Sequence, residues 1–550
     1  MTAPSSSPPF SAAPHLPAPE WLLLAVFAVV KIGLLLWIGP LEQPDSGGYK
    51  SFATMILAGG DWRHTIGLHQ TDPTSLRMIG FPAILAAAQL LAGGGWAWMV
   101  VGLQSLLGFF TTLLVYRAGR AATGSRRLAL IAAGCYAVSP ALQFDLTLLT
   151  DSVYGHLLAI LTALLVLWHA EDRPATALRL LGAGALLAAA LLIRSATMPL
   201  GLLFVALVVV WARGRGWLKG GAMVALFVLP LLATDAAYQT WNKSRSGEAF
   251  LTTDTRMALA QALVELQSRG VAVFNRDTVL DQMAQMVFAA QGEPTKDTAT
   301  ARMYALSAAL IETAHLSEIE AARLLKARFF ETALAHPGAV LGKVLGECTS
   351  KVMFTPFDPT RVLRHLLESR DIALFDGKHG FLKRPLAEWP PGDVVWLALE
   401  GVSRLIALAL VTGFLAAAPM ACRRALSGDG PAARCLALVM IAAGFIGAVS
   451  VVHLEERYIF GVMPALLFAA LPVLSSCAEK WRAASRRQRR RRDTAMDGPL
   501  RGSGSSGPPR FPSSEHGGHY GSRPGSFPSA RHPSAEGERR FRAVPGRIHR

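Results

Sequence analysis

The sequence predicts an all-α polytopic membrane protein with about ten membrane-spanning helices and a mostly helical external domain between the seventh and eighth spans. Hydrophobic residues make up 52% of the 550 residues and charged residues only 17%, whereas soluble domains carry about 25% charged residues. The mean hydropathy is +0.35. The five cysteines are an odd number and favour no disulfide framework, so packing must hold the fold together. Collagen-like, coiled-coil, disulfide-rich and wholly disordered chains are excluded by these figures.

Ten stretches approach the roughly 20 apolar residues that a spanning helix needs. They run at about 21–39, 96–116, 128–144, 149–168, 178–193, 198–211, 221–237, 394–418, 435–452 and 458–476. The residues before the first stretch contain no Lys or Arg, and its apolar run is too long for the core of a signal peptide. We therefore expect the first span to remain in the membrane as an anchor.

The short loops predict the orientation of the chain, because Lys and Arg concentrate on the cytoplasmic side. One set of alternate loops holds most of these residues: Arg117, Arg120, Arg126, Arg127, Arg173, Arg179, Arg213, Arg215, Lys219, Arg423, Arg424 and Arg434. Ten spans then place both termini in the cytoplasm, with a bacterial inner membrane as the expected location. A crossing at 78–91 would invert every later loop, so we expect that segment to be an external helix lying on the membrane.

The spans divide the chain into five parts: an N-terminal cytoplasmic segment (1–20), a membrane module (21–237) with a first external loop (40–95), an external domain (238–392), C-terminal spans (393–477) and a basic cytoplasmic tail (478–550). Apolar residues recur at helical spacing in the external domain, at 257–266 and 319–330. Ser317 and Glu320 form a capping-box pattern before the second of these helices.

The basic tail accounts for most of the net charge of +16, because 17 Lys or Arg face 6 Asp or Glu from residue 479 onward. Its Ser, Gly and Pro content cannot bury a core, so we expect disorder. The arginine run at 486–492 closely follows the last span and is typical of contact with anionic membrane lipids. No nucleic-acid partner is expected.

Acids and arginines from separate parts of the chain gather on the predicted external side. They include Asp45 and Arg77 in the first loop, Asp151 at the start of the fourth span, Arg194 after the fifth, and His453, Glu455, Glu456 and Arg457 before the tenth. Charges near hydrocarbon are costly, so this side is the first place to look for function. Lys31, deep in the first span, needs an acidic or carbonyl partner of its own. The cytoplasmic loops contain no Gly-rich phosphate-binding loop of the P-loop type.

The first loop and the last loop carry short motifs. The first reads Pro44-Asp45-Ser46-Gly47-Gly48-Tyr49, then Gly60-Asp61-Trp62, then Arg77-Met78-Ile79-Gly80-Phe81-Pro82; the last reads Glu456-Arg457-Tyr458, with Pro464 following. These motifs resemble the first external loop and the late Arg-Tyr motif of GT-C superfamily glycosyltransferases. The resemblance is greatest to bacterial members related to the lipid A aminoarabinose transferases and the protein O-mannosyltransferases, and it extends to about residue 476.

The resemblance implies an inverting enzyme that transfers a sugar from a polyprenyl-phosphate carrier to a lipid, polysaccharide or protein acceptor on the external face. Asp45 matches the family's acidic residue and would accept the proton of the acceptor. The departing phosphate needs positive charge, and arginine binds phosphate oxygens in a bidentate way; the candidates are Arg77, Arg194 and Arg457. Candidates to orient the acceptor or a cation are Asp151, Tyr49, Glu456 and Tyr458. Some relatives have two adjacent acids where Ser46 follows Asp45 here, so a divalent metal ion stays an open alternative.

Other classes of protein also stay open. An enzyme like the O-antigen ligases or polymerases would use a polyprenyl-diphosphate donor and Arg and His of an external loop, for which Arg361, Arg364 and His365 are candidates. Such an enzyme would tolerate loss of Asp45. A lipid or sugar transporter would keep its polar residues near the membrane midplane, whereas these acids lie at the external rim. A non-enzymatic scaffold would depend on the basic tail alone.

Overall fold

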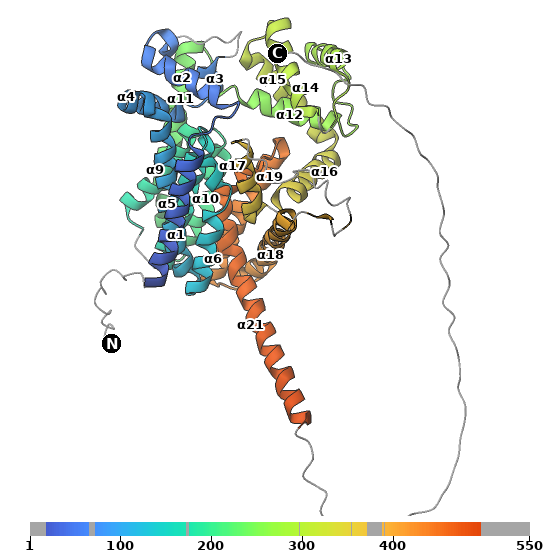
Figure 1. Cartoon of the computed structure of the whole chain (residues 1–550). Helices are drawn as coiled ribbons and strands as arrows, with labels where there is room; N and C mark the ends of the chain where they lie inside the picture. Colours follow the sequence, from blue (N-terminus) through green and yellow to red (C-terminus); the bar gives the residue numbers. More distant parts are fainter. Residues whose placement is uncertain are drawn as a thin grey trace, which may run out of the picture. The chain divides into compact units, whose positions relative to one another are not determined.

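The computed structural model describes residues 18–64, 72–171, 175–295, 298–353, 355–370, 385, 388–389 and 391–496 (Figure 1). Within these ranges the secondary structure is helical, apart from one isolated bridge between Leu41 and Thr147. Among the described residues, six helical stretches are long and apolar enough to cross a membrane, and three apolar helices are shorter. The predicted all-helical membrane fold is confirmed, while the number of spans stays a prediction.

The membrane part contains helices from two stretches of the chain, one that ends at Ser246 and one that begins at Pro391. They are α1 (Ala18–Ile38), α2 (Ser46–Ala58), α3 (Pro73–Leu76), α4 (Gly80–Ala92), α5 (Trp96–Thr123), α6 (Arg126–Ala137), α7 (Ala141–Phe144), α8 (Thr150–Ala170), α9 (Ala177–Ile193), α10 (Thr197–Ala212), α11 (Trp217–Ser246), α18 (Pro391–Leu426), α19 (Gly430–Val452), α20 (Glu456–Ile459) and α21 (Met463–Met496). The central pairs are α5 with α8, α9 with α11 and α10 with α19. Side chains such as Leu158, Phe204 and Phe227 fill one apolar core between them.

The residues predicted to form the external domain have an apolar core of their own, and the name external domain is kept for them below as a prediction. Helices α12 (Thr255–Gln267), α13 (Val279–Gln291), α14 (Ala299–Ala308) and α15 (Glu318–Ala335) pack around Leu263, Leu306 and Leu325. They lie together at one end of the helical bundle in Figure 1. Ser317 caps α15 and shares a capping box with Glu320, which confirms the sequence pattern.

Two further helices connect this domain to the last spans. Helix α16 (Pro337–Glu347) continues into a π-helical turn, η4 (Cys348–Val352), and packs against α19. Helix α17 (Pro359–Glu368) packs against α18. Both α16 and α17 begin at a proline, which suits the first position of a helix because its amide has no partner there.

The structure differs from the expected spans at several places. The stretch at 128–144 forms no long helix: α6 ends at Ala137 and the four-residue α7 begins after Pro140, because proline lacks the amide that would continue a helix. A helix forms near 78–91 as expected, and α4 then leads through the short turn η2 (Gly93–Gly95) into α5. Helix α11 runs on to Ser246, and the expected start of the tail at 478 falls inside α21. Residues 497–550 lie outside the described residues.

Lys31 of α1 has the acidic partner that its position requires. Its ammonium pairs with Asp145, and both side chains are buried. The Asp145 carboxylate also accepts a hydrogen bond from Ser152 (2.7 Å) and lies 2.7 Å from Nε2 of His156, whose Nδ1 lies 2.8 Å from the Tyr136 hydroxyl. An unpaired lysine inside hydrocarbon costs about 2.5–3.5 kcal/mol on insertion scales. The ion pair with Asp145 offsets this cost, so α1 can carry Lys31 within an otherwise apolar helix.

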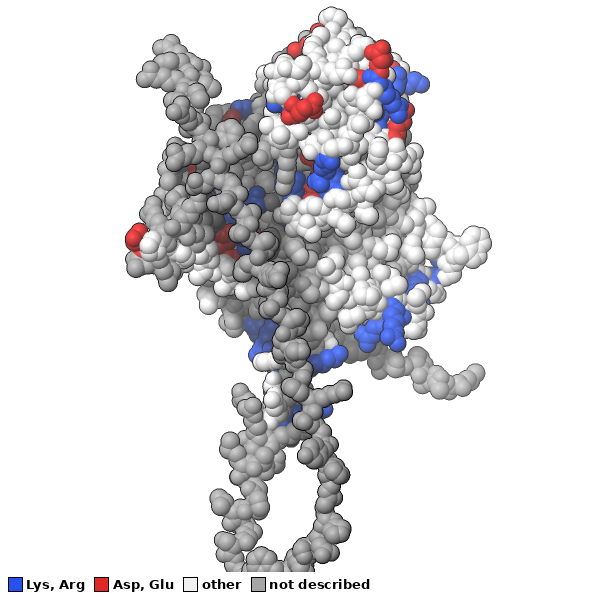
Figure 2. All heavy atoms as spheres, turned by 90° about the vertical axis from the view of Figure 1, so that its right-hand side faces the viewer, with Lys and Arg blue, Asp and Glu red and all other residues white. Residues whose placement is uncertain are grey.

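The charges on the surface are distributed unevenly along the bundle. On the face shown in Figure 2, Lys and Arg without Asp or Glu lie at the lower end, whereas both signs lie at the upper end. Figure 1 places α12–α15 at that upper end. This distribution is the one that the positive-inside rule associates with a cytoplasmic lower end, and the side of the membrane on which each end lies stays a prediction.

Candidate active site

Asp45 lies where the first loop turns into α2. The Leu41 amide donates to the Leu146 carbonyl (2.8 Å), and the Leu148 amide donates to the Leu41 carbonyl (2.9 Å). The Ser46 hydroxyl donates to the Leu148 carbonyl (2.9 Å). These bonds fix the loop to the segment before α8, while the Asp45 side chain keeps 30% of its surface exposed. The carboxylate is therefore held by a rigid backbone and stays accessible to solvent.

Two arginines from opposite parts of the chain bind the Asp45 carboxylate. Arg77 Nη2 donates to Oδ1 at 3.2 Å, and both terminal nitrogens of Arg457 donate to Oδ2 at 3.3 and 3.4 Å. Arg77 also lies 3.8 Å from Asp254, and its guanidinium lies 4.9 Å from the centre of the Tyr49 ring. The first loop, the last loop and the external domain meet at these contacts.

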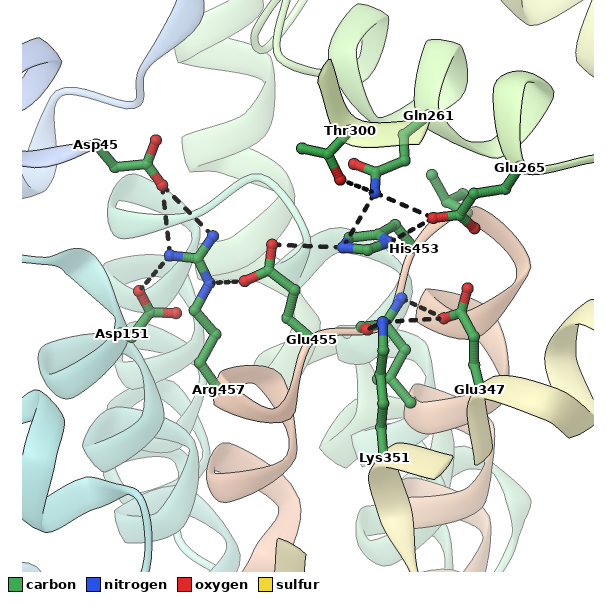
Figure 3. Close-up of polar contacts among 12 residues, drawn as sticks. Asp45, Asp151, Gln261, Glu265, Thr300, Glu347, Lys351, His453, Glu455 and Arg457 are labelled. Atoms are coloured by element: carbon green, nitrogen blue, oxygen red, sulfur yellow. Dashed lines mark hydrogen bonds and ion pairs between the residues drawn. The ribbon is translucent and has the colours of Figure 1, made fainter. Parts of the chain in front are cut away.

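A second acid lies beside this pair. Asp151, in the first turn of α8, accepts a hydrogen bond from Arg194 Nη1 (2.7 Å), and its other oxygen lies 3.7 Å from Arg457. The Asp151 side chain is only 2% exposed. The Arg194 guanidinium lies 4.3 Å from the centre of the Tyr458 ring. Figure 3 shows Arg457 between the carboxylates of Asp45 and Asp151.

The structure thus brings Asp45, Asp151, Arg77, Arg194 and Arg457 into one network of contacts. Two tyrosines adjoin it: the Tyr49 hydroxyl lies 3.3 Å from Thr150 Oγ1, next to Asp151, and the Arg194 guanidinium lies over the Tyr458 ring. The backbone of Glu456 belongs to α20, but its side chain lies outside the described residues. The catalytic, phosphate-binding and orienting roles of these residues stay predictions.

Three further residues lie near these groups: Glu455, which the sequence placed on the same side without a role, and Asp254 and Tyr304, which it did not single out. Glu455 pairs with the Arg457 Nε. Burial would raise the pKa of Glu455, but the hydrogen bond to His453 and the charge of Arg457 lower it to about 2. Asp254 and Tyr304 come from the external domain, and burial together with the charge of Asp45 raises the pKa of Tyr304. Glu455 stands two residues before Arg457, so its proximity was a usable signal; Asp254 and Tyr304 gave none.

Most of the acidic charge of this cluster is offset by the protein's own arginines, although Asp254 adds a fourth carboxylate 3.8 Å from Arg77. Three guanidinium groups face the carboxylates of Asp45, Asp151 and Glu455. A cation shared by Asp45 and Asp151 would have to lie where Arg457 does. The donor set therefore fits a divalent metal ion poorly, and Arg457 supplies positive charge at that place.

The alternative set of basic residues lies on α17. Arg364 is bound by Glu400 (3.3 Å), which also pairs with Arg404 as i, i+4 neighbours. Burial lowers the pKa of His365, which lines a cavity of about 530 Å³ together with Pro40–Gln43 and Glu368. Within the described residues, none of the polar contacts of Asp45 involves α17.

Comparison with known proteins adds one family and two structures. Residues 77–236 match the family described as dolichyl-phosphate-mannose-protein mannosyltransferase. No curated protein sequence is similar enough to match. The apo oligosaccharyltransferase of Archaeoglobus fulgidus is similar at 14% identity and a TM-score of 0.43, over 85% of this chain and 52% of that chain. ArnT from Cupriavidus metallidurans, bound to undecaprenyl phosphate, is similar at 14% identity and a TM-score of 0.32, over 83% and 77%. The chain thus spans about half the length of the archaeal enzyme.

Proposed function

We propose that this chain transfers a sugar from a polyprenyl-phosphate carrier to an acceptor at the external face of the membrane. Its residues 77–236 relate it to the GT-C membrane glycosyltransferases. The family match over residues 77–236 supports the relationship that the loop motifs predict. The description of that family names a sugar carried on dolichyl phosphate, which is a polyprenyl phosphate. The same class of donor is the one we propose here.

One observation carries the proposal: the Asp45 carboxylate is bound by Arg77 and Arg457, although 32 and 412 residues separate it from them. A fold that only needed to neutralise a loop acid would require one such partner. A sugar transfer requires both a base and positive charge for the leaving phosphate, next to one another. The site has both.

The reaction follows from an exchange of partners. The phosphate of the donor takes over the guanidinium groups of Arg77, Arg194 and Arg457, and Asp45 is released as a base. The acceptor hydroxyl or amine then attacks the anomeric carbon and gives its proton to Asp45. The bond between that carbon and the phosphate oxygen breaks, and polyprenyl phosphate leaves with its negative charge facing the arginines. Attack from the side opposite the phosphate inverts the anomeric centre.

The remaining predicted residues surround these groups. Asp151, Tyr49, Glu456 and Tyr458 are proposed to orient the acceptor, and the residues at 238–392 to form an external domain over the site. The proposed location is the inner membrane of a bacterium, with both termini in the cytoplasm. The acceptor is proposed to be a lipid, a polysaccharide or a protein.

The test is release of free polyprenyl phosphate by the purified chain in lipid nanodiscs. A set of undecaprenyl-phosphate sugars serves as donors and an envelope extract as acceptor. Release from one of these donors is expected, and the responsive donor names the sugar. If only undecaprenyl-diphosphate sugars react, and undecaprenyl diphosphate is the lipid released, the ligase-like alternative is favoured. The cavity beside His365 would then be the site to probe. A folded protein that releases nothing from either class would contradict the proposal.

A further inference from the structure

The end of α19 and the residue that follows it toward Arg457 are held by side chains of α16 and η4. The ammonium of Lys343 donates to the carbonyls of Ser450 (3.0 Å) and Val452 (2.8 Å), in the last turn of α19. The amide of Leu454 donates to Glu347 (2.6 Å), and Lys351 donates to the carbonyl of Leu454. Lys343, Glu347 and Lys351 recur every four residues along α16 and η4, so one face of these two elements binds the end of α19 and the start of the segment that leads to Arg457.

Lys343 also neutralises the acids around it. Its ammonium is fully buried and lies 2.7 Å from Glu347 and 3.1 Å from Glu265 of α12. Glu265, Glu347 and His453 offer ligand atoms within 4.8 Å of one another, as in a metal site. The ammonium of Lys343 already supplies a positive charge to both carboxylates. A buried charge is strongly destabilising when its partner is removed. Lys343, Glu265 and Glu347 therefore depend on one another for stability.

His453 connects these acids to Arg457. Its Nδ1 lies 3.1 Å from Glu265 and its Nε2 lies 3.5 Å from Glu455. Among the described residues, Gln261 of α12, Glu347 and Lys351 also face the ring. Figure 3 shows Glu265, His453, Glu455, Arg457 and Asp45 in one row. A continuous line of polar contacts thereby joins the external domain to Asp45, the proposed base.

We propose that α16 and His453 form a positioning device for Arg457, in which Lys343 and Glu347 fix the backbone and His453 fixes Glu455 against the guanidinium. This inference rests on the proposed function, because it takes Arg457 as a ligand of the donor phosphate. None of these residues touches the substrate in this role. They determine where Arg457 points when it exchanges Asp45 for phosphate.

The device depends on pH, because only a doubly protonated imidazole donates to carboxylates on both nitrogens. Burial would lower the pKa of His453, but the hydrogen bonds to Glu265 and Glu455 raise it above its ordinary value. Lys351 acts in the opposite direction. When the pH rises above the raised pKa, one of the two contacts is lost, and Glu455 and Arg457 become less fixed.

The test compares binding of undecaprenyl phosphate to native protein and to His453→Gln in nanodiscs, from about pH 6 to about pH 9.5. The variant should bind about three- to tenfold more weakly at the acidic end, which corresponds to one lost hydrogen bond. The difference should vanish at the alkaline end, where native His453 is neutral. The ratio of the two dissociation constants cancels the titration of the phosphate itself.

Two further variants separate positioning from folding. Lys343→Met should weaken binding at every pH, and Lys343→Arg, which keeps the charge, should restore part of it. His336→Gln, an exposed histidine of the same domain, is the matched control and should behave as native. If Lys343→Met does not fold, His453→Gln decides. A His453→Gln protein with native affinity across the whole pH range would overturn the inference while leaving the proposed function intact. A native protein that binds no undecaprenyl phosphate would overturn the proposed function and this inference with it.

Discussion

Removal of the Arg457 guanidinium should weaken binding of polyprenyl phosphate by about 10- to 100-fold. The group lies 3.3 Å from Asp45 and 3.7 Å from Asp151, pairs with Glu455, and keeps 19% of its side chain exposed. A charge-assisted hydrogen bond to phosphate contributes about 1.5–3 kcal/mol, and every 1.4 kcal/mol changes the dissociation constant about tenfold. Arg457→Ala loses this contribution entirely.

Arg457→Lys should fall between native and Arg457→Ala, because lysine keeps the charge but not the planar fork. The assay is an equilibrium titration of undecaprenyl phosphate into protein in nanodiscs at a fixed salt concentration. Arg213→Ala is the matched control, since Arg213 is an exposed arginine between α10 and α11. Thermal unfolding of each variant checks the fold. Native affinity in folded Arg457→Ala would refute the assignment of Arg457 to the phosphate.

Three other predictions follow from particular contacts. A methyl group at Gly108 would meet Lys31, Asp145 and His156, so Gly108→Ala should destabilise the fold by about 1–3 kcal/mol; an unchanged thermal midpoint in detergent would contradict this. Tyr304→Phe should lower kcat/KM about three- to tenfold if the hydroxyl bonds a substrate in the site, and native kinetics would remove Tyr304 from it. Glu455 has a pKa lowered to about 2, so its stabilisation is complete above roughly pH 5 and is lost as the pH falls through about 2. Native protein should therefore lose more stability than Glu455→Gln on acidification, and equal losses would argue against the Glu455 pair.

The fold class could be predicted because hydrocarbon imposes a simple rule on composition. Long apolar stretches such as 394–418 and 435–452 correspond to α18 and α19, whose apolar length is visible in the chain alone. The stretch at 128–144 is equally apolar in sequence, yet Pro140 interrupts it. Apolar content indicates that a segment prefers lipid, but a proline inside it decides whether one helix can cross.

The residues of the candidate site could be predicted where a charged residue stands next to an apolar stretch. Asp45, Arg77 and Arg457 stand beside apolar stretches, where a charged side chain needs a reason. Lys343 and Glu347 are four residues apart on α16, a spacing that usually marks an ion pair on a solvated helix face. Only the packing of α16 against the end of α19 turns them inward. Contacts of this kind depend on tertiary structure and leave no local pattern.

The most direct measurement is single-turnover sugar transfer by Asp45→Asn beside native protein, with the donor found in the release assay. Asparagine keeps the size of the side chain and an oxygen for Arg77 and Arg457, but it cannot accept the proton of the acceptor. Transfer should fall about 10²- to 10⁴-fold, as expected for loss of a general base, with donor affinity retained. Asp61→Asn, in the same loop, should transfer as native does. Transfer by folded Asp45→Asn within about tenfold of native would contradict the assignment of Asp45 as the base.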